Sequence, residues 1–104
     1  MSGRPRYPKP DANQSDFVEV LPPLGFLVMD VSPIAHLGFD LIVVGMHRRW
    51  LLPIVLLVEV KAPGGKLTET EEERAAEMCY KFGEDMPLIT AEKPEDVLAW
   101  YGAI

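Results

Sequence analysis

The sequence predicts a single α/β domain in which helices flank a mixed four-stranded sheet, in the order helix, three strands, helix, strand, helix. Three apolar runs of strand length follow one another between residues 25 and 61. A long amphipathic helix pattern then separates them from a fourth apolar run. A strand that rejoins a sheet through a helix usually pairs parallel to its neighbour, so a mixed sheet is expected.

Length and composition favour one folded unit. The chain has 104 residues, which suits one small domain. Residues 1–10 contain prolines and basic side chains without an apolar pattern, so a flexible basic arm is expected there. The folded domain is therefore expected to cover residues 11–104.

The first expected elements are a short helix over residues 11–21 and a strand over residues 25–31. Asp11 is a suitable N-cap, and a partial apolar stripe follows it at helical spacing. Pro22 and Pro23 lack the backbone N–H that a helix needs, so they end the helix.

Two longer apolar runs, residues 39–45 and 51–61, predict the second and third strands. Only the segment "MHRRW" separates them, so an antiparallel hairpin is expected. Pro53 cannot donate to a sheet ladder and therefore belongs at the start of the third strand or at an edge.

Residues 68–83 carry the strongest helix signal. Thr68 and Glu71 match a capping box, and Gly83 is placed to end the helix. Four residues form an apolar stripe that we expect to pack in the core or in a dimer interface: Ala75, Met78, Cys79 and Phe82. Residues 86–91 then predict the fourth strand, and residues 93–102 predict a closing helix.

Charge and composition exclude several classes of protein. The formal net charge of −6 argues against a protein that coats nucleic acid through bulk charge. No apolar run reaches the roughly 18 residues of a membrane span, so no membrane contact is expected. Cys79 is the one cysteine, so no internal disulfide can form, which fits a cytoplasmic location.

Charged residues stand at the end of the third expected strand, where a buried strand ordinarily has none. Side chains alternate between the two faces of a strand, so Glu59 and Lys61 share one face. Val58 and Val60 point the opposite way, into the expected core. Asp40, near the start of the partner strand, shares the face of Glu59 if it lies opposite residue 57 or residue 59.

The turn between these strands decides the register. A turn centred on Arg48 and Arg49 gives the first pairing, and one centred between Arg49 and Trp50 gives the second. A slip of one residue places Asp40 on the opposite face. The sequence leaves both pairings open.

Two carboxylates and an ammonium group that converge in this way suit phosphoryl chemistry. Mg²⁺ prefers a few carboxylate oxygens together with water and phosphate, so Asp40 and Glu59 are candidate ligands. The backbone carbonyl of Val60 is a third. Such a metal lowers the pKa of a water, and Lys61 could stabilise the attacking hydroxide and the charge of the transition state.

Ordinary structural roles compete with this interpretation. Asp40 could be a turn residue, and Glu59 with Lys61 could be an ion pair at a sheet edge, worth about 0–1 kcal/mol. Such a pair explains neither Asp40 nor the glycine-rich loop that follows. Glu71 is better explained as a helix cap than as a metal contact, although its place on the apolar stripe turns it toward the sheet.

The stretches "GFDLIVV" and "LLVEVKAPGGKLTETE" together resemble the D-x(n)-E-x-K core of the PD-(D/E)xK nuclease superfamily. More narrowly, the chain is similar to the virus-type replication-repair nuclease domain (VRR-NUC), including small stand-alone members from phages and prophages. The similarity begins at "DANQ", includes "VMDVS", and covers most of the chain.

The resemblance implies a restriction-endonuclease-like fold and an endonuclease that hydrolyses DNA with Mg²⁺ or Mn²⁺, in the cytoplasm of a bacterial or phage-infected cell. Asp40, Glu59 and Lys61 correspond to the family's aspartate, second acid and lysine. Gln14 falls where relatives place a polar or acidic residue near the metal, and Glu71 falls where they often carry glutamine. Phe39 departs from the pattern, because it replaces the proline of the family's "PD".

DNA is the implied partner, with branched or junction DNA as a candidate structure. Arg48, Arg49 and Lys66 are candidate phosphate contacts. A domain of this size offers little DNA-binding surface, so a homodimer with two sites is expected. Two other functions compete: a non-catalytic phage or bacterial interaction module that retains the nuclease fold, and a small metal-binding regulator.

Overall fold

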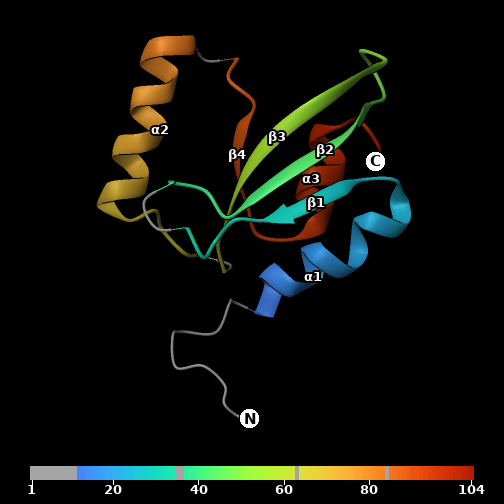
Figure 1. Cartoon of the computed structure of the whole chain (residues 1–104), viewed down its shortest axis with the longest axis horizontal. Helices are drawn as coiled ribbons and strands as arrows, with labels where there is room; N and C mark the ends of the chain where they lie inside the picture. The colour runs from blue at the N-terminus through green and yellow to red at the C-terminus, as the bar shows by residue number, and fades with distance from the viewer. Residues whose placement is uncertain (1–11, 35–36, 63, 84) are drawn as a thin grey trace.

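The computed structural model describes residues 12–34, 37–62, 64–83 and 85–104, so the basic arm expected over residues 1–10 lies outside the described residues. Its elements follow the predicted order (Figure 1). They are α1 (Ala12–Val20), a short 3₁₀ helix η1 (Pro22–Leu24), β1 (Leu27–Asp30), β2 (Leu41–His47), β3 (Leu52–Val60), α2 (Glu69–Phe82), β4 (Leu88–Ala91) and α3 (Pro94–Trp100).

The four strands form one mixed sheet in the order β1-β2-β3-β4. β2 pairs antiparallel with both β1 and β3, whereas β4 pairs parallel with β3. The predicted hairpin and the predicted parallel fourth strand are therefore confirmed. Pro53 lies near the start of β3, where β4 does not reach, so its missing N–H interrupts no ladder on that side.

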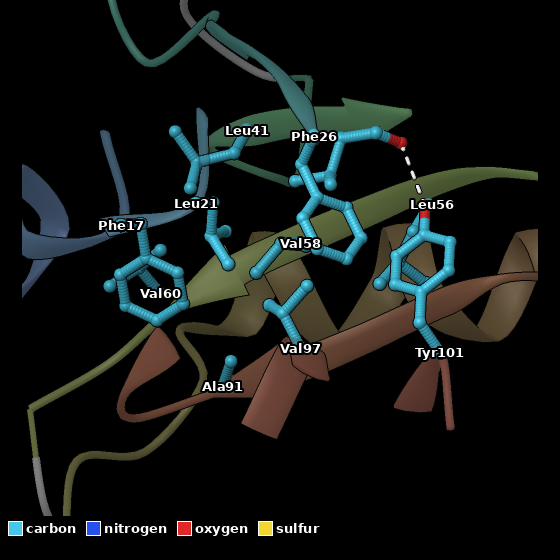
Figure 2. Packing of buried hydrophobic residues seen from close by; sticks show 11 residues of the cluster. Phe17, Leu21, Phe26, Leu41, Leu56, Val58, Val60, Ala91, Val97 and Tyr101 are labelled. Atoms are coloured by element: carbon cyan, nitrogen blue, oxygen red, sulfur yellow. Dashed lines mark hydrogen bonds between the residues drawn. The ribbon is translucent and has the colours of Figure 1, made fainter. Parts of the chain in front are cut away.

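The core lies between one face of the sheet and the helices α1 and α3 (Figure 2). Alternate residues of β2 and β3 point into it, as the strand period requires. Val58 and Val60 are among them, as predicted. The largest fully buried side chains in the described part of the chain are Tyr101, Phe17, Leu21, Leu41, Leu56, Val43, Val58 and Val97.

Tyr101 joins the end of α3 to the central hairpin. Its hydroxyl group donates to the carbonyl oxygen of Ile54 at 2.7 Å and lies 3.2 Å from that of Val43 (Figure 2). Burial raises the pKa of Tyr101 to about 12, so the hydroxyl keeps its proton and remains a donor. The last helix is thereby fixed to both strands of the hairpin.

Helix α2 has the predicted ends but not the predicted packing. Thr68 and Glu71 form the capping box, and the N–H of Gly83 closes the last turn. No residue of the helix is buried, and Tyr80 and Phe82 are 90% and 67% exposed. The expectation that its apolar stripe enters the core is wrong, because the helix stands to one side of the sheet (Figure 1). The exposed stripe leaves the alternative expectation, a dimer interface, as a prediction.

The face of the sheet opposite the core is also apolar. The register places Leu27 beside Val44 and Met29 beside Ile42 on this outer face, with Val55 and Leu57 on the next strand. Leu27, Met29 and Val55 are exposed. The sheet therefore has one packed face and one open apolar face. In the described ranges, no helix is long and apolar enough to cross a membrane.

The Tyr101 anchor predicts a measurable loss of stability. Tyr101→Phe should lower the free energy of unfolding by about 1–2 kcal/mol, because a buried carbonyl loses its donor. Urea unfolding measures the change. Tyr80→Phe is the matched control, since the Tyr80 side chain is exposed and should lose nothing. Equal stabilities of the two variants would contradict the anchoring role.

Candidate functional site

Asp40 lies beside Glu59 because of the register of the β2–β3 hairpin. His47 pairs with Leu52 and Leu41 pairs with Val58, so the turn is centred between Arg49 and Trp50. This is the second of the two registers that place Asp40 on the face of Glu59. The sequence pattern had left this choice open.

Asp40 directly precedes β2 and is bonded to β3 by its backbone and by its side chain. The N–H of Asp40 donates to the carbonyl of Val58 at 2.8 Å. One Asp40 carboxylate oxygen, Oδ2, accepts the N–H of Val60 at 2.9 Å. This bond fixes the carboxylate at the end of β3.

Glu59 and Lys61 lie on the same face of β3 and meet the first turn of α2. Glu59 is 4% exposed, which is unusual for an acid. The ammonium nitrogen of Lys61 is 3.5 Å from Oε2 of Glu59 and 2.8 Å from Oε1 of Glu71. The lysine thus bridges the strand acid and the helix acid.

Glu71 is a helix cap and a member of this cluster at once. Its Oε1 accepts the N–H of Thr68 at 2.8 Å, and its own N–H donates to the Thr68 hydroxyl at 3.2 Å. The same Oε1 receives the Lys61 ammonium. The predicted cap is therefore confirmed, and the ion pair of Glu71 with Lys61 ties α2 to the end of β3.

Burial and like charge make Glu59 a weak acid. Burial, the neighbouring charge of Asp40 and a hydrogen bond with Glu71 together raise the pKa of Glu59 to about 9. Burial also opposes ionisation of Glu71, but bonds from Lys61 and Thr68 outweigh it and hold the pKa of Glu71 below its ordinary value. At neutral pH, Glu71 is the acid that carries the counter-charge of Lys61.

These acids line a cavity of about 250 Å³. Asp40, Glu59 and Glu71 contribute carboxylates to its wall, and Ser32 and Thr70 contribute hydroxyl-bearing residues. The loop over residues 37–40 and the start of α2 complete the wall. A small polar ligand would therefore meet three carboxylates from three different segments.

The donor set fits a hard divalent cation that keeps most of its water. The charge of Asp40 favours the protonated form of Glu59, and a divalent ion bound between the two acids would take the place of that proton. The Val60 carbonyl leaves β3 on the same side as its N–H, toward Asp40, so it remains a candidate third oxygen. Among the described side chains, no group of three His, Cys, Asp or Glu residues is arranged as a metal cage. Mg²⁺ suits such a site, because it often binds through one or two carboxylates.

Gln14 is held next to the site without joining the carboxylates. It is buried on α1, and its Nε2 donates to Oδ1 of Asp30 at 3.2 Å and to the hydroxyl of Ser32 at 3.1 Å. Ser32 lines the cavity, so Gln14 reaches it through Ser32. Asp30 and Ser32 are site neighbours that the sequence reasoning missed. Their signal was the Asp-Val-Ser segment at the end of a predicted strand.

The structure separates the candidate DNA contacts. Lys66 is exposed on the loop between β3 and α2, near the cavity end of the sheet. Arg48 and Arg49 lie in the β2–β3 turn. Glu59 follows Leu52 by seven residues along β3, a distance of about 23 Å. The two arginines are therefore not part of the carboxylate site.

The raised pKa of Glu59 predicts how stability changes with pH. The folded protein keeps this proton between about pH 4.5 and 9, whereas the unfolded chain has lost it. Raising the pH through this range in EDTA should therefore lower the free energy of unfolding, by up to about 1.4 kcal/mol per pH unit. Urea unfolding at several pH values measures the slope.

A substitution isolates the contribution of this group. Glu59→Gln cannot ionise, so its stability should vary less with pH, and it should exceed that of the wild type at pH 8. Glu73→Gln, an exposed acid of α2, is the control and should keep the wild-type slope. A wild-type slope in Glu59→Gln would show that another group carries the pH dependence.

Comparison of the chain with protein-family models, curated proteins and solved structures finds no match.

Proposed function

We propose that this protein is a Mg²⁺- or Mn²⁺-dependent nuclease that hydrolyses DNA phosphodiester bonds on a restriction-endonuclease-like core. The single observation that carries the proposal is the meeting of Asp40 and Glu59 at one cavity, with Lys61 beside Glu59. Asp40 directly precedes β2, Glu59 lies on the neighbouring β3, and the Lys61 ammonium lies 3.5 Å from Glu59. This set combines metal-binding carboxylates with a cation for the phosphoryl charge.

Asp40 and Glu59 would hold the metal, with the Val60 carbonyl as a further oxygen. The metal, when bound, supplies a water of lowered pKa and positive charge at the phosphoryl oxygen. Lys61, oriented by Glu71 at 2.8 Å, offers its ammonium to the negative charge that builds up in the transition state. The oxygen of the attacking water bonds to phosphorus, and the water loses a proton. The phosphorus–oxygen bond to the leaving nucleotide breaks, and the leaving oxygen gains a proton.

A purely structural ion pair explains these residues less well. Pairs at sheet edges are exposed and contribute about 0–1 kcal/mol, whereas Glu59 is almost completely buried beside a second acid. That placement disfavours ionisation of Glu59. It therefore lowers the free energy of unfolding at pH values above the ordinary pKa of a glutamate. Strongly perturbed acids in a cavity are typical of functional sites.

Cleavage assays test the proposal directly. The wild type is incubated with supercoiled, single-stranded and four-way-junction DNA in Mg²⁺, in Mn²⁺ and in EDTA. We expect cutting with either metal and none in EDTA. Asp40→Asn, Glu59→Ala and Lys61→Ala should each lower the rate by about a hundredfold or more, because each removes charge that acts in the transition state.

Controls separate this outcome from contamination and misfolding. Lys81→Ala removes an exposed lysine of α2 and should cut at the wild-type rate. Equal activity in the wild type and in Glu59→Ala would indicate a contaminating nuclease. Absence of cutting on every substrate would instead favour the non-catalytic interaction module.

The open apolar surfaces support a homodimer. The outer face of the sheet exposes Leu27, Met29 and Val55, and α2 exposes Phe82. Exposed apolar patches of this kind commonly mark protein interfaces. We therefore propose that two copies associate through these surfaces and present two cavities to one DNA molecule. The same surfaces are the observation that favours an interaction module as the second candidate function.

A charge on the outer face tests association. Val55→Lys should leave the monomer folded, since Val55 is exposed, but should prevent two apolar faces from packing. Analytical ultracentrifugation should give a dimer for the wild type and a monomer for Val55→Lys. Glu95→Lys, on the exposed side of α3, is the control and should remain dimeric. A wild type that stays monomeric at all concentrations would contradict the proposal.

A further inference from the structure

The turn that joins β2 and β3 exposes large apolar side chains, which is unusual for a hairpin turn. We call residues 46–52 the hairpin tip. Turns of this kind are usually polar. Here Trp50 and Leu51 are 55% and 74% exposed, and Met46 and Leu52 are exposed as well. Several exposed apolar side chains in one place indicate a binding partner, whereas a single surface leucine does not.

The backbone of the hairpin tip is held by several hydrogen bonds. Nδ1 of His47 accepts the N–H groups of Arg49 and Trp50 at 3.2 Å each, and the N–H of Leu51 donates to the His47 carbonyl at 2.8 Å. The N–H of Arg48 donates to the Tyr101 carbonyl at 2.8 Å. The tip is thus a fixed structure that is attached to the end of α3.

Leu51 adopts a conformation that its side chain disfavours. Its φ of 59° is left-handed, and among the described residues it is the one non-glycine with positive φ. A bulky residue remains in this region only when its surroundings impose it, and such residues cluster at binding sites. The strained backbone of Leu51 therefore belongs to a tip whose side chains are held in a fixed arrangement.

Trp50 presents a flat aromatic surface. One side of its indole stacks on His47, with ring centroids 3.9 Å apart and planes inclined by 11°. The ring of Trp100 stands nearly perpendicular to the indole of Trp50, with ring centroids 6.0 Å apart and planes inclined by 85°. The indole is supported from one side while more than half of the residue stays exposed. Supported, exposed aromatic rings are the platforms on which unpaired bases stack.

Arg48 and Arg49 add uncompensated positive charge next to this ring. Both are exposed, and neither has an ion-pair partner among the residues that the structure describes. By contrast, the lysine and arginine of α2 both contact the carboxylate of Glu77. In a chain of net charge −6, the tip is therefore a local site for anions.

We propose that the hairpin tip binds single-stranded nucleic acid, with one unpaired base stacked on Trp50 and the flanking phosphates on Arg48 and Arg49. Stacking on an aromatic ring and cationic contacts to the backbone are the two components of such recognition. The tip lies about 23 Å from the carboxylate cavity along β3. It is thus a second nucleic-acid contact, and its binding does not require cleavage.

The neighbouring charge favours nucleic acid over the other partners of an apolar tip. A second copy of this acidic chain would have to cover both guanidinium groups, and an apolar partner would leave them without counter-charge. A base on Trp50 brings its own phosphates to the adjacent arginines. A lipid bilayer and a second copy are therefore outcomes of the test below.

Binding is measured in EDTA, so that no cutting occurs. The probe is a fluorescently labelled single-stranded oligothymidine, with a fully paired duplex of the same length for comparison. The wild type should bind the single strand more tightly and lose tryptophan emission on binding. Trp50→Ala should weaken binding about tenfold, and Trp50→Phe should retain most of it. Arg49→Ala should lower the slope of log affinity against log salt by about 0.7.

Matched variants control for surface and charge. Tyr80→Ala removes an aromatic residue that is more exposed than Trp50, and Lys81→Ala removes a cation, both on α2. Both should bind oligothymidine as the wild type does. Circular dichroism establishes that each variant is folded, and Arg49→Ala tests the tip even if Trp50→Ala does not fold.

Three results would overturn the inference. The first is equal affinity of the wild type and Arg49→Ala together with unchanged tryptophan emission. The second is an equal loss of binding in Tyr80→Ala. The third is that the tip variants abolish binding to anionic vesicles, or self-association, while oligothymidine binding persists. The nuclease proposal is decided separately by metal-dependent cutting of junction and supercoiled DNA.

Discussion

Antiparallel pairing of β2 with β3 is the constraint on which the rest of the molecule depends. At one end, its register brings Asp40 beside Glu59, and the carboxylate of Asp40 accepts the N–H of Val60. At the other end it forms the rigid hairpin tip. Between them, Tyr101 bonds both strands and attaches α3. A shift of one residue would exchange the faces of every side chain and separate the two carboxylates.

The electrostatics of the cavity follow from this pairing. The pairing brings Asp40 next to the buried Glu59, and Glu59 keeps its proton at neutral pH. Lys61 does not neutralise that pair directly, since its shorter contact is to Glu71 on the following helix. The capping box of α2 therefore sets both where the helix begins and where the lysine points. Folding alone does not require a buried, protonated acid beside a second acid, and strongly perturbed acids of this kind are typical of functional sites.

The surfaces outside the cavity divide into two kinds. The outer face of the sheet and the stripe of α2 are apolar and carry little charge, which suits a second protein surface. The hairpin tip combines an aromatic ring with two arginines, which suits a base and its phosphates. If both proposals hold, a small domain would gain substrate contacts from both surfaces, because association would double the number of sites and the tip would extend the area that meets nucleic acid.

The sequence by itself determined the order of the elements, the hairpin, the parallel fourth strand and both ends of α2, because these depend on local spacing, capping and turn chemistry. It also identified Asp40, Glu59 and Lys61 as a possible set. Only the tertiary structure decided the register, since the turn length is compatible with two pairings. It alone showed the bond between Asp40 and the N–H of Val60, the attachment of Gln14 to Asp30 and Ser32, and the separation of Arg48 and Arg49 from the cavity. The stripe of α2 was mistaken for core because amphipathic spacing shows that a helix has an apolar side, but the packing of distant segments decides what covers it.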